Sequence, residues 1–229
     1  MKKIIASTIF IFFAITSYSK SFTLEGVGSS ILGGSSDGGS FNLDDTLGMQ
    51  DQILGDYMKG SADFNKALVI IMDAYDLKDE SSKLQAQQEF LNGSDISSSN
   101  FNDNMKEVAI LHKDSVKIIE SKISSGASLD DIGKKKLATA YAPFFSGLVK
   151  TGLAAKLGMD TFKSIKSEGT KNPMILTKFS GLATIVKEVG TSLPKMIKTS
   201  NLLMKYGKDN GIEIPAEAKE QQADLSGMF

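Results

Sequence analysis

The chain has no cysteine, no tryptophan and no arginine, so that lysine supplies all 26 basic residues. Without cysteine the protein can form neither a disulfide nor a thiolate nucleophile, and it has no lipoprotein cysteine to acylate. Without arginine it lacks the planar guanidinium that makes bidentate contacts with phosphates and base edges. This composition argues against sequence-specific nucleic-acid binding, and we expect no nucleic-acid partner.

Motifs that would identify a reaction are also missing. The sequence contains no G-x-S-x-G, no phosphate-binding glycine loop and no H-E-x-x-H. The segments Ser192–Lys195 and Lys150–Gly152 match two short motifs of serine β-lactamases, but they occur in reversed order and within helical patterns. We therefore predict that the protein is not an enzyme and has no cofactor.

The single histidine, His112, is the first residue to consider as a metal ligand or a pH-sensitive group. No second histidine and no cysteine is present to share a metal ion with it, and no loop spaces its acidic residues in an EF-hand pattern. We expect no bound metal. The preferred interpretation of His112 is a residue at the edge of the core, hydrogen-bonded to a neighbouring helix.

The first nineteen residues have the pattern of a secretory signal peptide. Lys2 and Lys3 precede an apolar stretch from residue 4 to residue 15, and Ser17 and Ser19 place small residues before a cleavage site. The apolar stretch is shorter than the roughly 20 residues of a transmembrane helix, although an uncleaved anchor is the alternative. We expect a periplasmic or secreted protein, cleaved near Ser19.

The charge is distributed unevenly along the chain. Residues 21–131 contain 19 acids and 8 lysines, whereas residues 132–208 contain 14 lysines and 3 acids. Residues 209–229 are acidic again, with 5 acids and 1 lysine. Such asymmetry predicts one of two arrangements: acidic and basic helices that face each other in one bundle, or a charged surface that meets an oppositely charged partner.

Apolar residues recur at three- and four-residue spacing along most of the chain after residue 44. This pattern predicts an all-α fold, an irregular bundle of about six to eight helices. We expect a signal peptide (1–19), a flexible Gly/Ser-rich arm (20–43), and one helical domain (44–208) that is acidic over 44–131 and basic over 132–208. An acidic tail or short terminal helix (209–229) follows.

Several residues indicate where helices begin and end. Gly60 suggests a break in the first long helix, and Ser128–Asp131 has the form of a capping box before a later one. Gly190 is expected to end a helix, with Thr191 or Ser192 capping the last long helix.

The stretch from Ala138 to Lys166 organises the predicted bundle. Pro143 either kinks this helix or starts a new one, and three glycines after it indicate close helix packing or an open groove. Lysines make the same segment cationic and amphipathic, as in helices that lie on anionic membranes. The candidate ligand-binding residues around such a groove are Phe144, Phe145, Leu148, Gly152, Met159, Phe162, Phe179, Lys150 and Lys156.

Two functions remain open on this basis. The first is a protein-interaction module, such as an adaptor, assembly factor or effector, whose partner is an envelope or secreted protein. The alternative is lipid binding, in which the basic C-terminal half binds a lipid, another amphipathic ligand or an anionic membrane surface.

Overall fold

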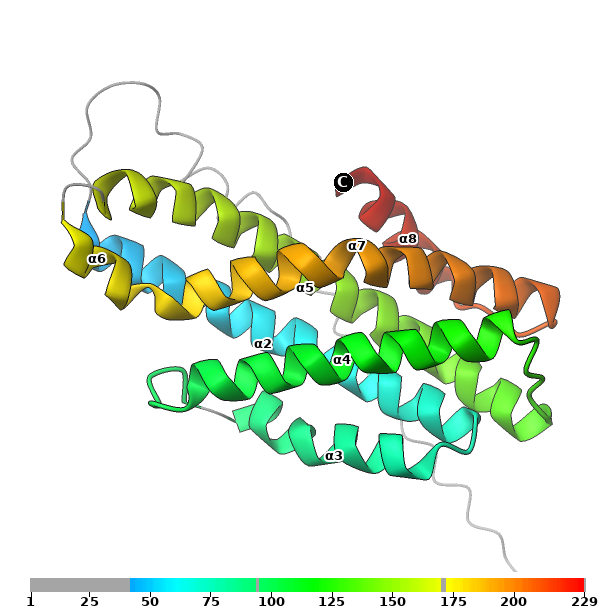
Figure 1. Ribbon diagram of the computed structural model, residues 1–229. Helices are drawn as coiled ribbons and strands as arrows, with labels where there is room; N and C mark the ends of the chain where they lie inside the picture. The colour runs from blue at the N-terminus through cyan, green and yellow to red at the C-terminus, as the bar shows by residue number, and fades with distance from the viewer. Residues whose placement is uncertain (1–41, 94, 170–171, 229) are drawn as a thin grey trace, which may run out of the picture. The chain divides into compact units, whose positions relative to one another are not determined.

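The computed structural model describes residues 42–93, 95–169 and 172–228, and over these ranges the chain is helical with no strand (Figure 1). The helices are α2 (Leu43–Ala74), α3 (Lys78–Gly93), α4 (Phe101–Ser124), α5 (Asp131–Gly169), α6 (Pro173–Lys178), α7 (Ser180–Asp209) and α8 (Ala216–Met228). This confirms the predicted all-α bundle. The predicted signal peptide, and all but the last two residues of the predicted arm, lie outside the described residues.

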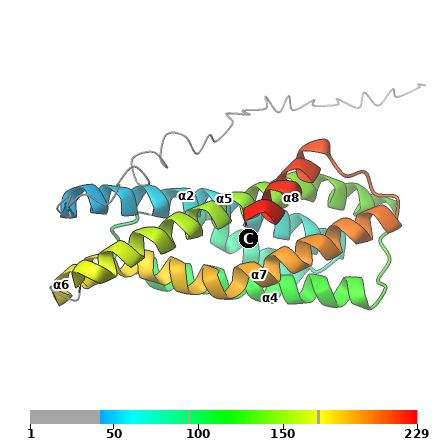
Figure 2. The same cartoon turned by 90° about the horizontal axis from the view of Figure 1, so that it is seen from above.

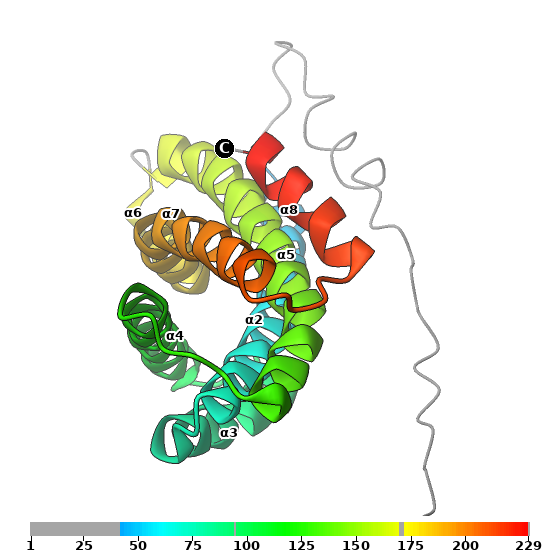
Figure 3. The same ribbon diagram turned by 90° about the vertical axis from the view of Figure 1, so that its right-hand side faces the viewer.

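The pair formed by α2 and α5 is the centre of the helical unit, which spans residues 42–229. The two helices run side by side (Figures 1 and 2) and make the most extensive contact between any two elements. Helix α3 packs on α2, α8 packs on α5, and α7 contacts α5 while α4 lies against α7 (Figure 3). The remaining helices are therefore arranged around the α2–α5 pair.

Aromatic side chains fill the space where α2 and α5 meet. Phe64 of α2 packs against Phe144 of α5 with ring centroids 5.0 Å apart, and Phe144 packs against Phe145 at 5.6 Å. Tyr141 is fully buried as well, and its hydroxyl donates to the carbonyl oxygen of Leu203 in α7 at 2.9 Å. This part of the core is thus apolar, and the buried Tyr141 hydroxyl has the partner that such a group requires.

Two glycines allow the backbones of α2 and α5 to approach each other closely. A Cβ atom on Gly147 would lie 2.5 Å from the backbone nitrogen of Phe64, and one on Gly60 would lie 2.8 Å from the backbone nitrogen of Thr151. Neither helix has room for a methyl group at its crossing. The prediction that Gly60 breaks the first helix was wrong, because α2 is continuous through it. Gly60 serves the packing between helices instead.

Two other helix boundaries differ from the expected ones. The Asp130 carboxylate, and not Ser128, accepts from the backbone N–H of Gly133 at 2.7 Å at the start of α5. Helix α7 runs through Gly190, and the hydroxyls of Thr191 and Ser192 donate to the carbonyl oxygen of Glu188 within the helix rather than capping a new one. Of the two alternatives at Pro143, the start of a new helix is excluded, because α5 is continuous through it.

Acidic and basic helices are neighbours in the bundle. Acidic α2 packs against basic α5, where the Lys150 ammonium lies 2.6 Å from the Asp63 carboxylate. Helix α4 packs against basic α7, where Lys195 lies 3.7 Å from Glu120. The charge asymmetry in the sequence therefore corresponds, at these two contacts, to pairing within the chain.

The Gly147 contact can be tested by comparing two alanine substitutions. Gly147→Ala should lower the free energy of unfolding by about 1–3 kcal/mol, because the added methyl group forces the α5 and α2 backbones apart. Gly55→Ala is the matched control, since a Cβ on Gly55 meets nothing within 4 Å. It should raise stability by about 0.5–1 kcal/mol through helix propensity alone. Denaturant unfolding measures both. Equal stabilisation by the two substitutions would show that the helices do not meet at Gly147.

Candidate functional site

The nine candidate ligand-binding residues occupy three kinds of environment. Five are buried, namely Phe144, Phe145, Leu148, Gly152 and Phe179. Met159 and Phe162 are half-buried, and Lys150 and Lys156 are exposed. The first three pack into the same core cluster at the α2–α5 contact. None of the nine lines either of the two hollows described below.

His112 lies in the core, 3% exposed, and contacts α2. Its Nε2 atom lies 3.2 Å from Oδ1 of Asn65, whose Nδ2 donates to the carbonyl oxygen of Leu84 and to Oε1 of Gln88. Because the Asn65 oxygen can only accept, the imidazole donates from Nε2. Burial lowers the pKa of His112 to about 3. The preferred interpretation of His112 as a hydrogen-bonded core residue is confirmed.

A shallow apolar groove runs between α3 and α4. Its floor consists of Ile110, Leu111 and Ile118 on one side of α4, and its volume is about 370 Å³. Ile110 is 57% exposed, which is unusual for a large apolar side chain on this surface. The remaining lining is mostly charged and comes from both helices: Glu80, Lys83, Glu107, Asp114 and Ser115.

The groove lies outside the residues predicted from the sequence to form a site. The buried stripe of α4 runs through Met105, Val108 and Val116. The residues of the groove repeat at the same helical spacing, from 107 through 110, 111 and 114 to 118, but on another side of the helix. Three apolar residues off the buried stripe were the signal that could have found it.

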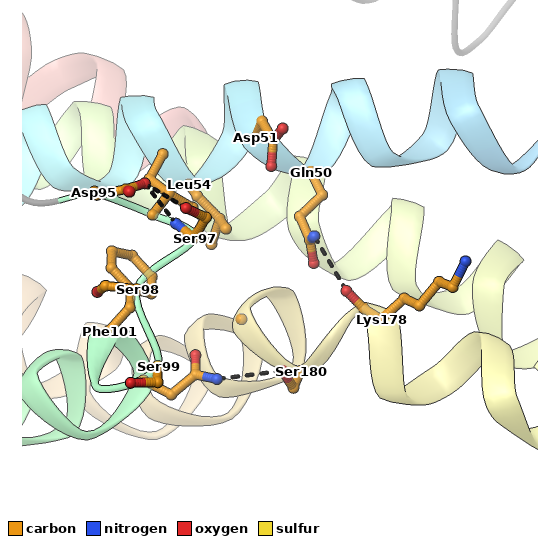
Figure 4. Close-up of a pocket in the computed structure, with 13 residues that line it drawn as sticks. Gln50, Asp51, Leu54, Asp95, Ser97, Ser98, Ser99, Phe101, Lys178 and Ser180 are labelled. Carbon is orange, nitrogen blue, oxygen red and sulfur yellow. Dashed lines mark hydrogen bonds between the residues drawn. The ribbon is translucent and has the colours of Figure 1, made fainter.

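A second hollow, of about 670 Å³, is polar and lies where three segments of the chain converge (Figure 4). Its walls come from the first half of α2, from the α3–α4 loop with the start of α4, and from the junction of α6 with α7. The lining residues are Gln50, Asp51, Leu54, Asp95, Ile96, Ser97, Ser98, Ser99, Phe101, Asn102, Lys178, Ser180 and Gly181. We call this hollow the polar pocket.

Hydrogen bonds within its walls fix several of these side chains. Nε2 of Gln50 donates to the carbonyl oxygen of Lys178 at 3.3 Å, and Nδ2 of Asn102 donates to the Ser180 hydroxyl at 3.2 Å. The backbone N–H and the hydroxyl of Ser97 both donate to Oδ1 of Asp95, which lowers the pKa of that carboxyl. Asp95 is therefore an anion at neutral pH.

The side-chain oxygens of Gln50 and Asn102 have no hydrogen-bond partner among the described residues. Oε1 of Gln50 and Oδ1 of Asn102 are both out of contact with solvent and receive no donor from the described residues. Buried acceptors are satisfied in the great majority of cases. Two unsatisfied acceptors in the walls of one pocket are therefore its most unusual feature.

No protein-family model matches this sequence, and neither a curated protein nor a solved structure is significantly similar to it. Among the described helices, none combines the length and the apolar character needed to cross a membrane. The same residues contain no group of three or more His, Cys, Asp or Glu side chains placed to hold a metal ion.

The buried state of His112 predicts a distinct loss of stability in mild acid. Its pKa is about 3 in the folded chain and about 6.5 when unfolded. Because the unfolded state binds the proton first, the contribution is complete above pH 6.5 and is lost as the pH falls towards 3. Between pH 7 and pH 5 the protein should lose about 2 kcal/mol more than a His112→Gln variant.

Denaturant unfolding at pH 7, 6 and 5 gives the free energy of unfolding of the unmodified protein and of the His112→Gln variant. The difference between the two pH dependences isolates the histidine, because both proteins have the same carboxylates. Parallel pH dependences for the two proteins would show that the imidazole is accessible to protons in the folded state.

Proposed function

We propose that this protein is a non-enzymatic protein-interaction module, an adaptor or assembly factor, whose docking surface is the α3–α4 groove. The observation that supports this proposal best is Ile110, a large apolar side chain that is 57% exposed at the centre of a groove with charged edges. Exposed apolar surface within a polar rim is characteristic of protein-binding sites. The groove lies between two helices, which is the geometry that receives an amphipathic helix of a partner.

The charges at its edges define the chemistry of the partner. Glu80, Glu107 and Asp114 surround the groove against a single lysine, Lys83. A helix with apolar anchors at three- and four-residue spacing and lysine or arginine beside them would complement both the floor and the rim. The proposed occupant is therefore a basic amphipathic helix of a protein partner.

The signal-peptide pattern of residues 1–19 supports a location in the cell envelope or outside the cell for this interaction. The alternative function, binding of a lipid or an anionic membrane, receives less support from the core. Phe144, Phe145 and Phe179 are in contact with other protein side chains and are fully buried. Gly147, one of the three glycines that suggested a groove, packs against the backbone of Phe64 where α2 and α5 meet.

Site-specific crosslinking tests the docking surface. A photoreactive phenylalanine analogue is placed at position 110 in one protein and at position 132 in another, in cells of the source organism. Ile132 is the matched control because it is also an isoleucine, is 66% exposed and lies at the start of α5, outside the groove. Position 110 should capture one reproducible protein through a peptide with a basic amphipathic pattern, and position 132 should not.

A second variant separates binding from folding. Ile110→Glu should abolish the capture by a probe at position 83, on the opposite edge of the groove, because it adds a charge to the apolar floor. It should change the free energy of unfolding by no more than about 0.5 kcal/mol, as is usual at exposed positions. Equal capture at positions 110 and 132, or capture that survives Ile110→Glu, would contradict the proposal.

A further inference from the structure

We infer that the α3–α4 groove recognises an arginine of its partner helix, which lies on the apolar floor and is held by Ser115, Glu80 and Glu107. The inference rests on the proposed function, because it concerns the occupant of the same groove. It adds the identity of one side chain of that occupant and names the residues that select it.

The side chain of Ser115 is a polar group on the floor of the groove. The residue is 2% exposed and lines the hollow together with Leu111 and Ile118. Its hydroxyl forms no hydrogen bond with any of the described residues, and yet it is not among the unpartnered side-chain atoms that are shut off from solvent. The small exposed area of Ser115 therefore includes this hydroxyl, and a molecule in the groove can reach it. Buried polar groups have a partner in the great majority of cases.

Two carboxylates that line the same groove are also without partners. Glu80 is half-buried and Glu107 is exposed, and neither forms an ion pair with a described residue. Elsewhere in the described chain, four aspartates pair with a lysine three residues further along. Glu80 has Lys83 at that same spacing, but the two are not paired. The carboxylates of Glu80 and Glu107 are therefore available to an incoming group.

The charges that line the groove favour a cationic donor. They comprise three carboxylates and one ammonium, and Asp114 is already paired with Lys117 at 2.6 Å. An anionic group would be repelled by Glu80 and Glu107, and a group that only accepts hydrogen bonds would form none with them. A cation with several N–H donors can bond to the Ser115 hydroxyl and to the carboxylates together. Such charge-assisted hydrogen bonds are about twice as strong as neutral ones.

Arginine suits this groove better than lysine does. The floor is apolar, with Ile110, Leu111 and Ile118, and a guanidinium is more weakly hydrated than an ammonium, so that less hydration is lost when it lies there. Its N–H donors are spread over a rigid plane and can reach acceptors on both helices, whereas the ammonium of lysine is a compact point charge. Because this chain contains no arginine, the inferred occupant is a different protein and not a second copy.

A peptide selection on the full chain tests the arginine. The probe is a displayed library of helical peptides in which leucines are fixed at three- and four-residue spacing and every other position is randomised. Clones that also bind the Ile110→Glu variant are discarded. The remaining clones should share an arginine at one fixed position relative to the leucines.

The other outcomes separate this inference from the proposed function. Clones in which lysine and arginine are interchangeable, or in which another residue is shared, would overturn the arginine inference and leave the proposed function standing. A selection that retains no clone after the Ile110→Glu step would contradict the proposed function, and the inference would fail with it.

Variants of the groove then show whether the named residues recognise the arginine. One selected peptide is compared with the same peptide carrying norleucine in place of the arginine, and fluorescence anisotropy measures both affinities. Ser115→Ala and Glu80→Gln should each weaken binding of the arginine peptide at least about tenfold, as expected for the loss of a hydrogen bond to a charged group. Each should change the affinity of the norleucine peptide less than about twofold.

Ser121→Ala is the matched control, because Ser121 is exposed on the same helix and does not line the groove. It should leave the affinities of both peptides unchanged. Ser115→Ala should leave the melting temperature unchanged or higher, because it removes a hydroxyl that has no partner. An equal loss with the arginine and norleucine peptides would show that Ser115 affects the shape of the groove and does not recognise arginine, which would overturn the inference.

Discussion

The close approach of α2 and α5 at Gly60 and Gly147 is the contact on which the rest of the bundle depends. At these positions the backbone of one helix lies where a side chain of the other would begin. Because Gly147 fits over the backbone of Phe64, the Phe64 ring reaches Phe144 and Phe145 inside the core. The other helices then pack on the two outer sides of this pair, α3 on α2 and both α7 and α8 on α5.

Ion pairs between helices contribute less to the stability of this bundle than its apolar core does. Lys150 and Asp63 are each more than a third exposed, and ion pairs of this kind contribute about 0.2–1 kcal/mol. The burial of one Phe or Leu contributes more, about 1.5–3 kcal/mol. Like-charged helices are neighbours as well, since basic α7 packs on basic α5. The division of charge along the sequence thus corresponds to ion pairs between helices at two contacts, Lys150 with Asp63 and Lys195 with Glu120.

Helix content followed from the sequence, whereas the positions of breaks and sites did not. The three- and four-residue spacing of apolar residues is a local property, and it located most helices. Gly60 and Gly190 had the composition of helix ends, but α2 and α7 are continuous through them, and Gly60 packs closely against α5. The groove and the polar pocket each combine segments distant in the chain, for example Gln50 with Lys178. The spacing of apolar residues within one segment cannot predict which distant segment lies beside it.

Helix α4 lines both the groove and the polar pocket, and its attachment to the bundle explains why it can present them. Its first turn, with Asn102, lines the polar pocket, and its middle, with Ile110, forms the groove. On its buried side His112 donates to Asn65, which is held in turn by α3, and near its end Glu120 accepts from Thr199 of α7. These bonds join α4 directly to α2 and α7 at different points along its length, and through Asn65 to α3. The exposed residues of α4 are therefore free to differ in chemistry from one turn to the next, because none of them is needed to keep the helix in place.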